Sequence, residues 1–287
     1  MIIDSDGKEV VSSIRITERN RNSPLGAGGA ATVYEAEEVL FPDGDTCKGT
    51  RRIAFKLTHS DKTQEIYEAA QNEVVITSEL DGVPGVVRVF GCGFAINDKG
   101  EKVPFTSLQL IEGETFSAYL KRQGTSDPTT VISYLCEIVE TLEQVHSRAI
   151  AHLDLKPQNV IISAETGKPV LCDFGISKRS KEISHSENDP KYLKDRLPAG
   201  STSYMSPEML IIMHAKIFAE QSIALADVAW FQEAFSKYRT DTMDVFSFGM
   251  MAYRSLSGSR QPFEGMDEKI QLKELKLILI ISSNIFL

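Results

Sequence analysis

Two short stretches of the sequence concentrate side chains that can do chemistry. Residues 150–163, IAHLDLKPQNVIIS, hold Asp154 and Asn159, and LCDFGISK follows at 171–178 with Asp173. Asn159 comes directly before an apolar, β-branched run, and Asp173 comes directly after another, so each is expected at the end of a short strand. If those two strands are neighbours, their polar side chains lie close enough to share one site.

The residue types in these stretches suit phosphoryl transfer. Asn159 and Asp173 offer the oxygen ligands that Mg²⁺ prefers in proteins. Asp154 is then free to orient a hydroxyl group, and Lys156 can neutralise charge that develops on a transferred phosphoryl group. Any one of these residues alone fits a solvated turn, but their occurrence together and in this order is very improbable by chance.

A glycine-rich turn lies near the N-terminus, in LGAGGAATVYEAE at 25–37. Gly26, Gly28 and Gly29 allow backbone amides to approach a phosphate closely. A strand rather than a helix follows, so this is not a dinucleotide-binding fingerprint. An ordinary glycine-rich hairpin turn explains the pattern about equally well.

Lys56 lies inside a run of β character, RRIAFKL. A buried lysine in a strand needs a counter-charge, and Glu73, on the helix predicted next along the chain, is a candidate. An outward-facing surface lysine is the alternative. Cys172, directly before Asp173, is expected to be either a thiol open to alkylation or a packed thiol.

The order of predicted elements indicates two units. Short apolar runs separated by turns predict a β-rich region over 1–112, interrupted by one helix over 63–80. From 113 onward helices dominate, and 129–148 has a strong 3.6-residue period. We therefore expect a bilobal α+β protein, with a β-rich N-terminal lobe over 1–112 and a helical lobe over 113–287.

Composition and charge narrow the class of protein. The chain has 287 residues, of which 42% are hydrophobic, so it can bury a substantial core. A net charge of −9 argues against nucleic acid as the main partner, because phosphate binding needs a basic surface. The four cysteines form no C-x-x-C pair, which favours reduced thiols. No signal peptide or membrane span is expected, and an intracellular, cytoplasmic location follows.

Taken together, these stretches resemble a eukaryotic-type protein kinase domain, from about Leu25 to Gly265. The matching stretches are AFK (54–56), HLDLKPQN (152–159), DFG (173–175), GSTSYMSPE (200–208) and DVFSFGM (244–250). In the family, the stretch like 200–208 ends an activation segment on which a peptide docks. Lys156 and this stretch resemble serine/threonine kinases rather than tyrosine kinases.

The resemblance implies ATP and Mg²⁺ as cofactors and a protein with a Ser or Thr acceptor as partner. It assigns the substrate hydroxyl to Asp154, the γ-phosphate to Lys156, and the α- and β-phosphates to Lys56 paired with Glu73. The residues expected to contact ATP are Leu25, Gly26, Gly28, Gly29, Val33, Ala54, Lys56, Leu108, Gln109, Ile111 and Ile161.

Further roles follow from the same resemblance. Asn159 and Asp173 would bind Mg²⁺, and Asp244 would hold the backbone of the catalytic loop. Adenine would hydrogen-bond the backbone of Gln109 and Ile111.

The chain also departs from the family pattern. Residues 211–238 are an insertion with amphipathic helical spacing, which either packs on the helical lobe or presents a partner surface. After PFEGMDEK the family continues through several more helices, so the resemblance implies that terminal helices are missing.

Three functions are compatible with these observations. The leading one is a serine/threonine protein kinase, because every residue of the phosphoryl-transfer set is present. The alternative is a nucleotide-binding, pseudokinase-like interaction or scaffold module with little catalysis, because of the shortened helical lobe. A small-molecule kinase of related fold is the third, and the peptide-docking stretch argues against it.

Overall fold

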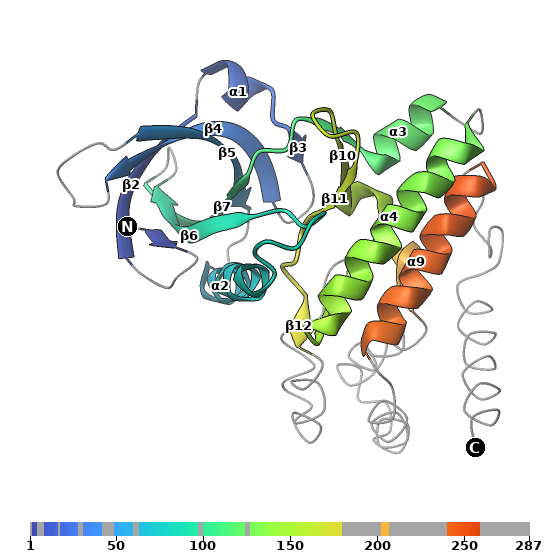
Figure 1. Cartoon of the computed structure of the whole chain (residues 1–287). Coiled ribbons are helices and arrows are strands. Elements are labelled where there is room, and N and C mark those ends of the chain that lie inside the picture. The colour runs from blue at the N-terminus through green and yellow to red at the C-terminus, as the bar shows by residue number, and fades with distance from the viewer. Residues whose placement is uncertain are drawn as a thin grey trace, which may run out of the picture.

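A computed structural model gives the fold of the chain, with a curled sheet beside a helical region (Figure 1). The described residues are 2–4, 9–16, 18–27, 31–41, 49–59, 63–96, 100–123, 127–179, 202–206 and 240–258. The predicted insertion over 211–238 and the C-terminal stretch after 258 lie outside them. None of the described helices has both the length and the apolar character needed to cross a membrane.

The large sheet closes on itself. Its seven strands are, in order across the sheet, β2 (Glu9–Arg15), β1 (Ile2–Asp4), β6 (Val89–Ile96), β7 (Lys102–Gln109), β5 (Gly49–Thr58), β4 (Ala31–Phe41) and β3 (Gly26–Ala27). β2 also pairs with β4, from Val11 opposite Phe41 to Arg15 opposite Glu37. This pairing joins the two sides of the sheet, as the curled ribbon in Figure 1 shows.

Apolar side chains from strands all round the sheet meet inside the curl. Ile53 and Phe55 of β5, Phe105 of β7 and Ala36 of β4 are buried together, and Ile14 of β2 packs against them. The Phe55 and Phe105 rings lie 4.9 Å apart between centroids. Burial of these side chains stabilises the closed arrangement.

Two helices accompany the sheet. α2 (Thr63–Glu79) packs Ala70 and Val74 against Val89 and Cys92 of β6 and Leu108 of β7. The short α1 (Glu18–Asn22) joins β2 to β3.

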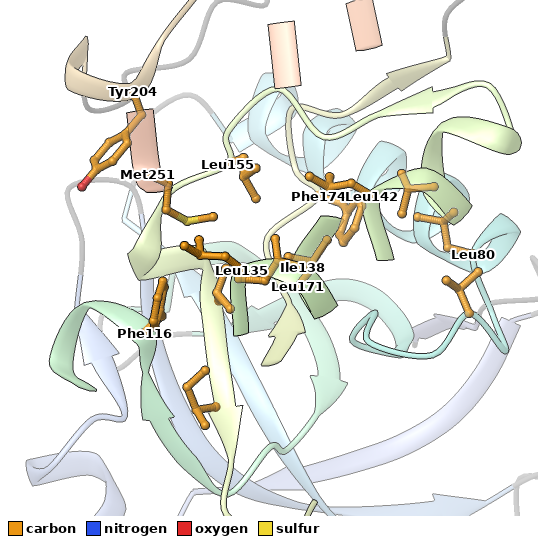
Figure 2. Close-up of a cluster of buried hydrophobic side chains, with 14 of the residues drawn as sticks. Leu80, Phe116, Leu135, Ile138, Leu142, Leu155, Leu171, Phe174, Tyr204 and Met251 are labelled. Atoms are coloured by element: carbon orange, nitrogen blue, oxygen red, sulfur yellow. The ribbon is translucent and has the colours of Figure 1, made fainter. Parts of the chain in front are cut away.

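The helical region is built from α3 (Phe116–Gln123), α4 (Pro128–Ser147) and α9 (Thr240–Leu256). α4 begins at Pro128, within one residue of the start of the helix predicted over 129–148. The Asp127 carboxylate caps it by accepting a hydrogen bond from the Thr130 N–H, and Pro128 occupies the first helical position. α4 and α9 lie side by side (Figure 1). Their inward faces pack in one core cluster, which Figure 2 shows.

Short strands and 3₁₀ turns carry the polar stretches between these helices. The strands are β8 (Gly113–Thr115), β9 (Ile150–Ala151), β10 (Val160–Ser163), β11 (Pro169–Leu171) and β12 (Lys178–Arg179). β10 pairs with both β8 and β11, and β12 pairs with β9. The 3₁₀ turns are η1 (Pro157–Asn159) and η2 (Thr202–Tyr204).

The predicted α+β class and the two long predicted helices, over 63–80 and 129–148, are confirmed. The predicted division into units 1–112 and 113–287 stays a prediction.

Gly113 makes a close backbone contact at this division. A Cβ atom there would lie 2.0 Å from the carbonyl oxygen of Ile162, and φ is +154°. At Gly167, φ is +69° but nothing lies within 4 Å of a Cβ. Both replacements by alanine strain the backbone, but only Gly113→Ala adds an overlap, which we expect to cost about 1–3 kcal/mol more. The free energies of unfolding of both variants, measured in urea, test this difference. Equal losses of stability in the two variants would contradict the expectation.

Candidate active site

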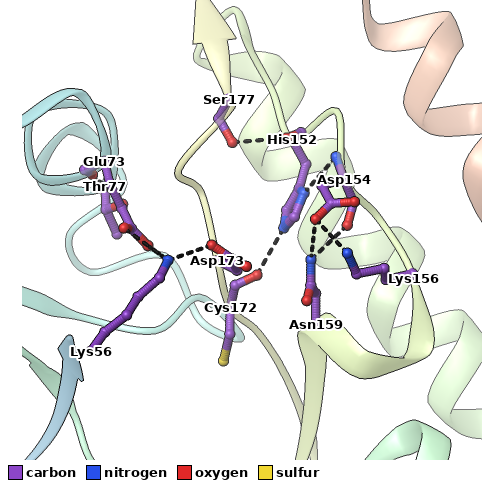
Figure 3. Close-up of polar contacts among 10 residues, drawn as sticks. All are labelled: Lys56, Glu73, Thr77, His152, Asp154, Lys156, Asn159, Cys172, Asp173 and Ser177. Atoms are coloured by element: carbon purple, nitrogen blue, oxygen red, sulfur yellow. Dashed lines mark hydrogen bonds and ion pairs between the residues drawn. The ribbon is translucent and has the colours of Figure 1, made fainter. Parts of the chain in front are cut away.

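Lys56 is the centre of a three-residue ionic cluster. Its Nζ lies 3.1 Å from Oε2 of Glu73 on α2 and 2.6 Å from Oδ1 of Asp173, which follows β11 (Figure 3). The predicted pairing of Lys56 with Glu73 is therefore confirmed. Glu73 is buried, whereas 42% of the Asp173 side chain is exposed.

The three charged groups of this cluster shift one another's pKa values. Burial alone would lower the pKa of Lys56, but the carboxylates of Asp173 and Glu73 outweigh it and raise that pKa. Lys56 holds the pKa of Asp173 below its usual value. Burial raises the pKa of Glu73, and Lys56 offsets this only in part. Of the two carboxylates, Asp173 therefore holds its negative charge more readily. Its ionised form stabilises the folded state at pH values above the pKa that it has in the unfolded chain. This stabilisation is lost as the pH falls through the lower pKa that Asp173 has in the folded protein.

A second cluster forms around Asp154. Its Oδ2 accepts hydrogen bonds from Lys156 Nζ at 2.7 Å and from Asn159 Nδ2 at 2.9 Å. Asn159 Nδ2 also donates to the backbone carbonyl of Asp154 at 2.8 Å. The amide nitrogen of Asn159 therefore faces Asp154, and its oxygen points away from it (Figure 3). All three predicted residues of this loop lie together.

Asp244 of α9 holds this loop from behind. Its fully buried carboxylate accepts the N–H groups of His152 and Leu153, each at 2.7 Å, and lies 2.8 Å from His146 Nε2. The predicted support of the loop backbone by Asp244 is confirmed. Leu153 has φ of +64°, a conformation that costs free energy and persists where surrounding contacts impose it.

His152 connects the two clusters, and the sequence reasoning assigned it no role. Its Nδ1 accepts from the Asp154 N–H at 3.2 Å, and its Nε2 donates to the Cys172 carbonyl at 3.0 Å. These partners require the neutral imidazole with the proton on Nε2. The ring also packs on Phe174, with 4.6 Å between centroids. His152 therefore fixes the backbone next to Asp154 relative to the backbone next to Asp173.

The residues expected around adenine gather on adjacent strands. Ala54 of β5 lies opposite Leu108 of β7, and both pack in one apolar cluster with Ile111. Ile161 of β10 lies opposite Val170, which packs against the same cluster. The strand pairings thus bring together residues that are far apart in the sequence.

The other expected nucleotide contacts lie around this cluster. Val33 of β4 is opposite both Lys56 and Gly26, and its carbonyl accepts the N–H of the exposed Leu25 at 2.8 Å. The N–H of Gln109 already donates to the Arg88 carbonyl at 2.8 Å, so an adenine contact at Gln109 would use its carbonyl. Gly28 and Gly29 lie outside the described residues.

Cys172 is a packed thiol rather than an ionised one. Burial, reinforced by the neighbouring Asp173 carboxylate, raises the pKa of this thiol to about 12. The uncharged thiol therefore predominates at pH 8. We therefore expect iodoacetamide at pH 8 to label the exposed Cys136 long before Cys172, as followed by peptide mass spectrometry. Labelling of Cys172 as fast as that of Cys136 would contradict this expectation.

The curled sheet beside helices, the Lys56–Glu73 ion pair and the loop that carries Asp154 agree with the resemblance to a protein kinase domain. The chain belongs to the protein kinase family: the family model described as "Protein kinase domain" matches residues 19–285.

Several curated proteins are similar to this chain. The serine/threonine-protein kinase PknA of Nostoc sp. is 30% identical over 189 residues, covering 64% of this chain and 31% of that protein. The probable serine/threonine-protein kinase PknB of Lactococcus lactis is 26% identical over 84% of this chain and 31% of its own length. For the serine/threonine-protein kinase PrkC of Bacillus subtilis the identity is 25%, over 88% of this chain and 32% of PrkC. The chain thus spans about a third of the length of these relatives.

Proposed function

We propose that this protein is an ATP-dependent serine/threonine protein kinase, which transfers the γ-phosphate of ATP to a Ser or Thr hydroxyl of a protein. The observation that carries the proposal is the joining of two clusters through His152. One is Lys56 with Glu73 and Asp173, and the other surrounds Asp154. Phosphoryl transfer depends on positioned charges rather than on covalent steps by the protein, and these clusters supply such charges.

The Asp154 cluster would act on both the acceptor hydroxyl and the transferred phosphoryl group. Asp154 would orient the acceptor hydroxyl and take its proton. Lys156, whose Nζ already lies 2.7 Å from Asp154 Oδ2, would neutralise charge on the transferred phosphoryl group. Lys56, held by Glu73, would bind the α- and β-phosphates.

Asn159 and Asp173 fit a magnesium ion. Asp173 has a lowered pKa and a partly exposed carboxylate, and the amide oxygen of Asn159 points away from its bonds to Asp154. Both are the oxygen donors that Mg²⁺ prefers. Bound there, Mg²⁺ would neutralise negative charge on the phosphates.

The apolar cluster containing Ala54, Leu108 and Ile111 would contact adenine, together with Val33 and Ile161. The carbonyl of Gln109 and the backbone of Ile111 would form its hydrogen bonds. The phosphates would lie under the turn that holds Leu25, Gly26, Gly28 and Gly29.

A serine or threonine acceptor is favoured over tyrosine for two reasons. Lys156 stands two residues after Asp154, as in serine/threonine kinases. The similar proteins PknA, PknB and PrkC are named serine/threonine-protein kinases.

The test is transfer of radiolabelled phosphate from Mg-ATP to a generic protein acceptor and to the protein itself, with the melting temperature measured in parallel. We expect transfer to protein and a higher melting temperature with Mg-ATP. Stabilisation without transfer would favour the nucleotide-binding scaffold instead. Transfer to a small metabolite but to no protein would favour a small-molecule kinase.

A further inference from the structure

Arg52 of β5 binds two carboxylates that come from different parts of the chain. Its Nε lies 2.9 Å from Oε1 of Glu35 on β4, and its Nη2 lies 2.7 Å from the same oxygen. Its Nη1 lies 2.5 Å from Oε1 of Glu112, sixty residues further along the sequence. Since three donors of one planar guanidinium group are bound, the group has a defined orientation.

Glu112 belongs to the connection between the sheet and the helical region. This connection, residues 110–112, runs from the end of β7 at Gln109 to the start of β8 at Gly113. The backbone carbonyl of Glu112 accepts the N–H of Ala164, directly after β10, at 2.7 Å. The next residue, Gly113, pairs with Ser163 of β10. The backbone of the connection is therefore bonded beside β10, whereas the side chain of Glu112 is bonded to β5.

The same contacts border the proposed adenine site. Side chains two residues apart in a strand point to the same face of the sheet, so Arg52 shares a face with Ala54. Glu35 lies opposite Ala54 in the pairing of β4 with β5. Glu112 directly follows Ile111, whose backbone would bond adenine. Arg52 and its two partners therefore lie at the edge of the surface that adenine would contact.

We propose that Arg52 is a positioning residue for the nucleotide, because its bond to Glu112 fixes the connection relative to β5. The proposal rests on the proposed function, which places ATP at this site. Ala54 lies on β5, whereas Ile111 lies on the connection, so adenine can bind both only when they hold one relative position. The bond from Arg52 to Glu112 restricts that position before the nucleotide arrives, and such preorganisation raises affinity.

The expected effect is modest, because both side chains are exposed. An exposed ion pair changes an equilibrium constant by about fivefold at most, and salt screens it. We expect Arg52→Gln and Glu112→Gln each to weaken nucleotide binding about two- to fivefold at about 0.01 M salt. At about 1 M salt the variants and the unaltered protein should bind alike relative to one another.

The test measures the dissociation constants of ATP and of adenosine for the full chain, by displacement of a fluorescent ATP analogue. The two variants change the local charge in opposite directions. If Arg52 acted by its charge alone, Arg52→Gln would weaken ATP binding, Glu112→Gln would strengthen it, and uncharged adenosine would bind all three proteins equally. If Arg52 positions the connection, both variants bind both ligands more weakly, and the double variant is no weaker than either single variant.

Arg88→Gln and Asp81→Asn are matched controls for the two variants. Arg88 and Asp81 form a surface ion pair whose side chains are 57% and 52% exposed, against 58% and 61% for Arg52 and Glu112. Removing either partner of this pair should leave both dissociation constants unchanged. Melting temperatures without ligand show whether each variant is folded, and a loss of affinity without a lower melting temperature excludes a merely structural effect.

The outcomes separate this role from the kinase activity. In transfer assays Arg52→Gln and Glu112→Gln should raise KM for ATP more than they lower kcat, because neither residue belongs to the clusters around Asp154 and Lys56. Opposite effects of the two variants, or unchanged binding of adenosine, would overturn only the role of Arg52. A chain that binds both ligands as expected but transfers no phosphate would refute the kinase activity alone. An unaltered protein that binds neither ligand would refute the nucleotide site and this role together.

Discussion

Asp154→Asn should lower the rate of phosphate transfer about 10²–10⁴-fold, because the amide cannot take the proton of the acceptor hydroxyl. The change keeps the size of the side chain and one oxygen, so the bonds from Lys156 and Asn159 are only partly lost. We therefore expect the fold and the stabilisation by Mg-ATP to survive. Initial rates with a protein acceptor measure the first expectation, and melting temperatures measure the second.

Asp81→Asn is the matched control for this experiment. Asp81 is an exposed aspartate that pairs with Arg88 on the surface, so the same chemical change there should leave the transfer rate unaltered. A surface ion pair of this kind contributes little to stability. If Asp154→Asn were as active as Asp81→Asn, Asp154 would not be the base, and the proposed mechanism would fail.

Asp244→Ala should be the most destabilising single change in the loop region. It leaves the buried N–H groups of His152 and Leu153 without an acceptor, and each such loss costs about 1–3 kcal/mol, or about 2–6 kcal/mol together. Phosphate transfer should fall as well, because these N–H groups position the loop that carries Asp154. The free energy of unfolding in urea measures the first effect.

Asp241→Ala tests whether this loss is specific. Asp241 lies one turn earlier on α9, and its carboxylate accepts the N–H of Thr242 near the start of that helix. Losing a single hydrogen bond of this kind typically costs about 0.5–1.5 kcal/mol. A similar loss in the free energy of unfolding for both variants would show that the contacts of Asp244 with the loop backbone are not the cause of the destabilisation.

The elements that the sequence patterns predicted are those with strong periodicity. The apolar spacing of residues 129–148 predicted α4, and alternating or β-branched runs predicted β4 and β5. β1 was missed because three residues, IID, show no alternation, and their strand conformation depends on pairing with β6. α1 was missed because ERNRN has no apolar face.

The residue types of the site could be predicted from the sequence, whereas part of their geometry could not. The pairing of Lys56 with Glu73 followed from the need of a buried lysine for a counter-charge. The bridging role of His152 could not be foreseen, because it depends on two backbone groups from different loops. The bond from Arg52 to Glu112 joins segments sixty residues apart, and neither local pattern indicates it.

The closed sheet also has a consequence for synthesis on the ribosome. Ile2 pairs with Gly93, so the first strand leaves the ribosome long before its partner on β6 has been made. At about 5–20 residues per second, that delay is on the order of 5–20 s. During that interval the N-terminal strand has an unsatisfied edge, which is the kind of segment that pairs with other chains. The edge of β1 that pairs with β6 in the folded protein therefore stays unpaired until β6 has been made.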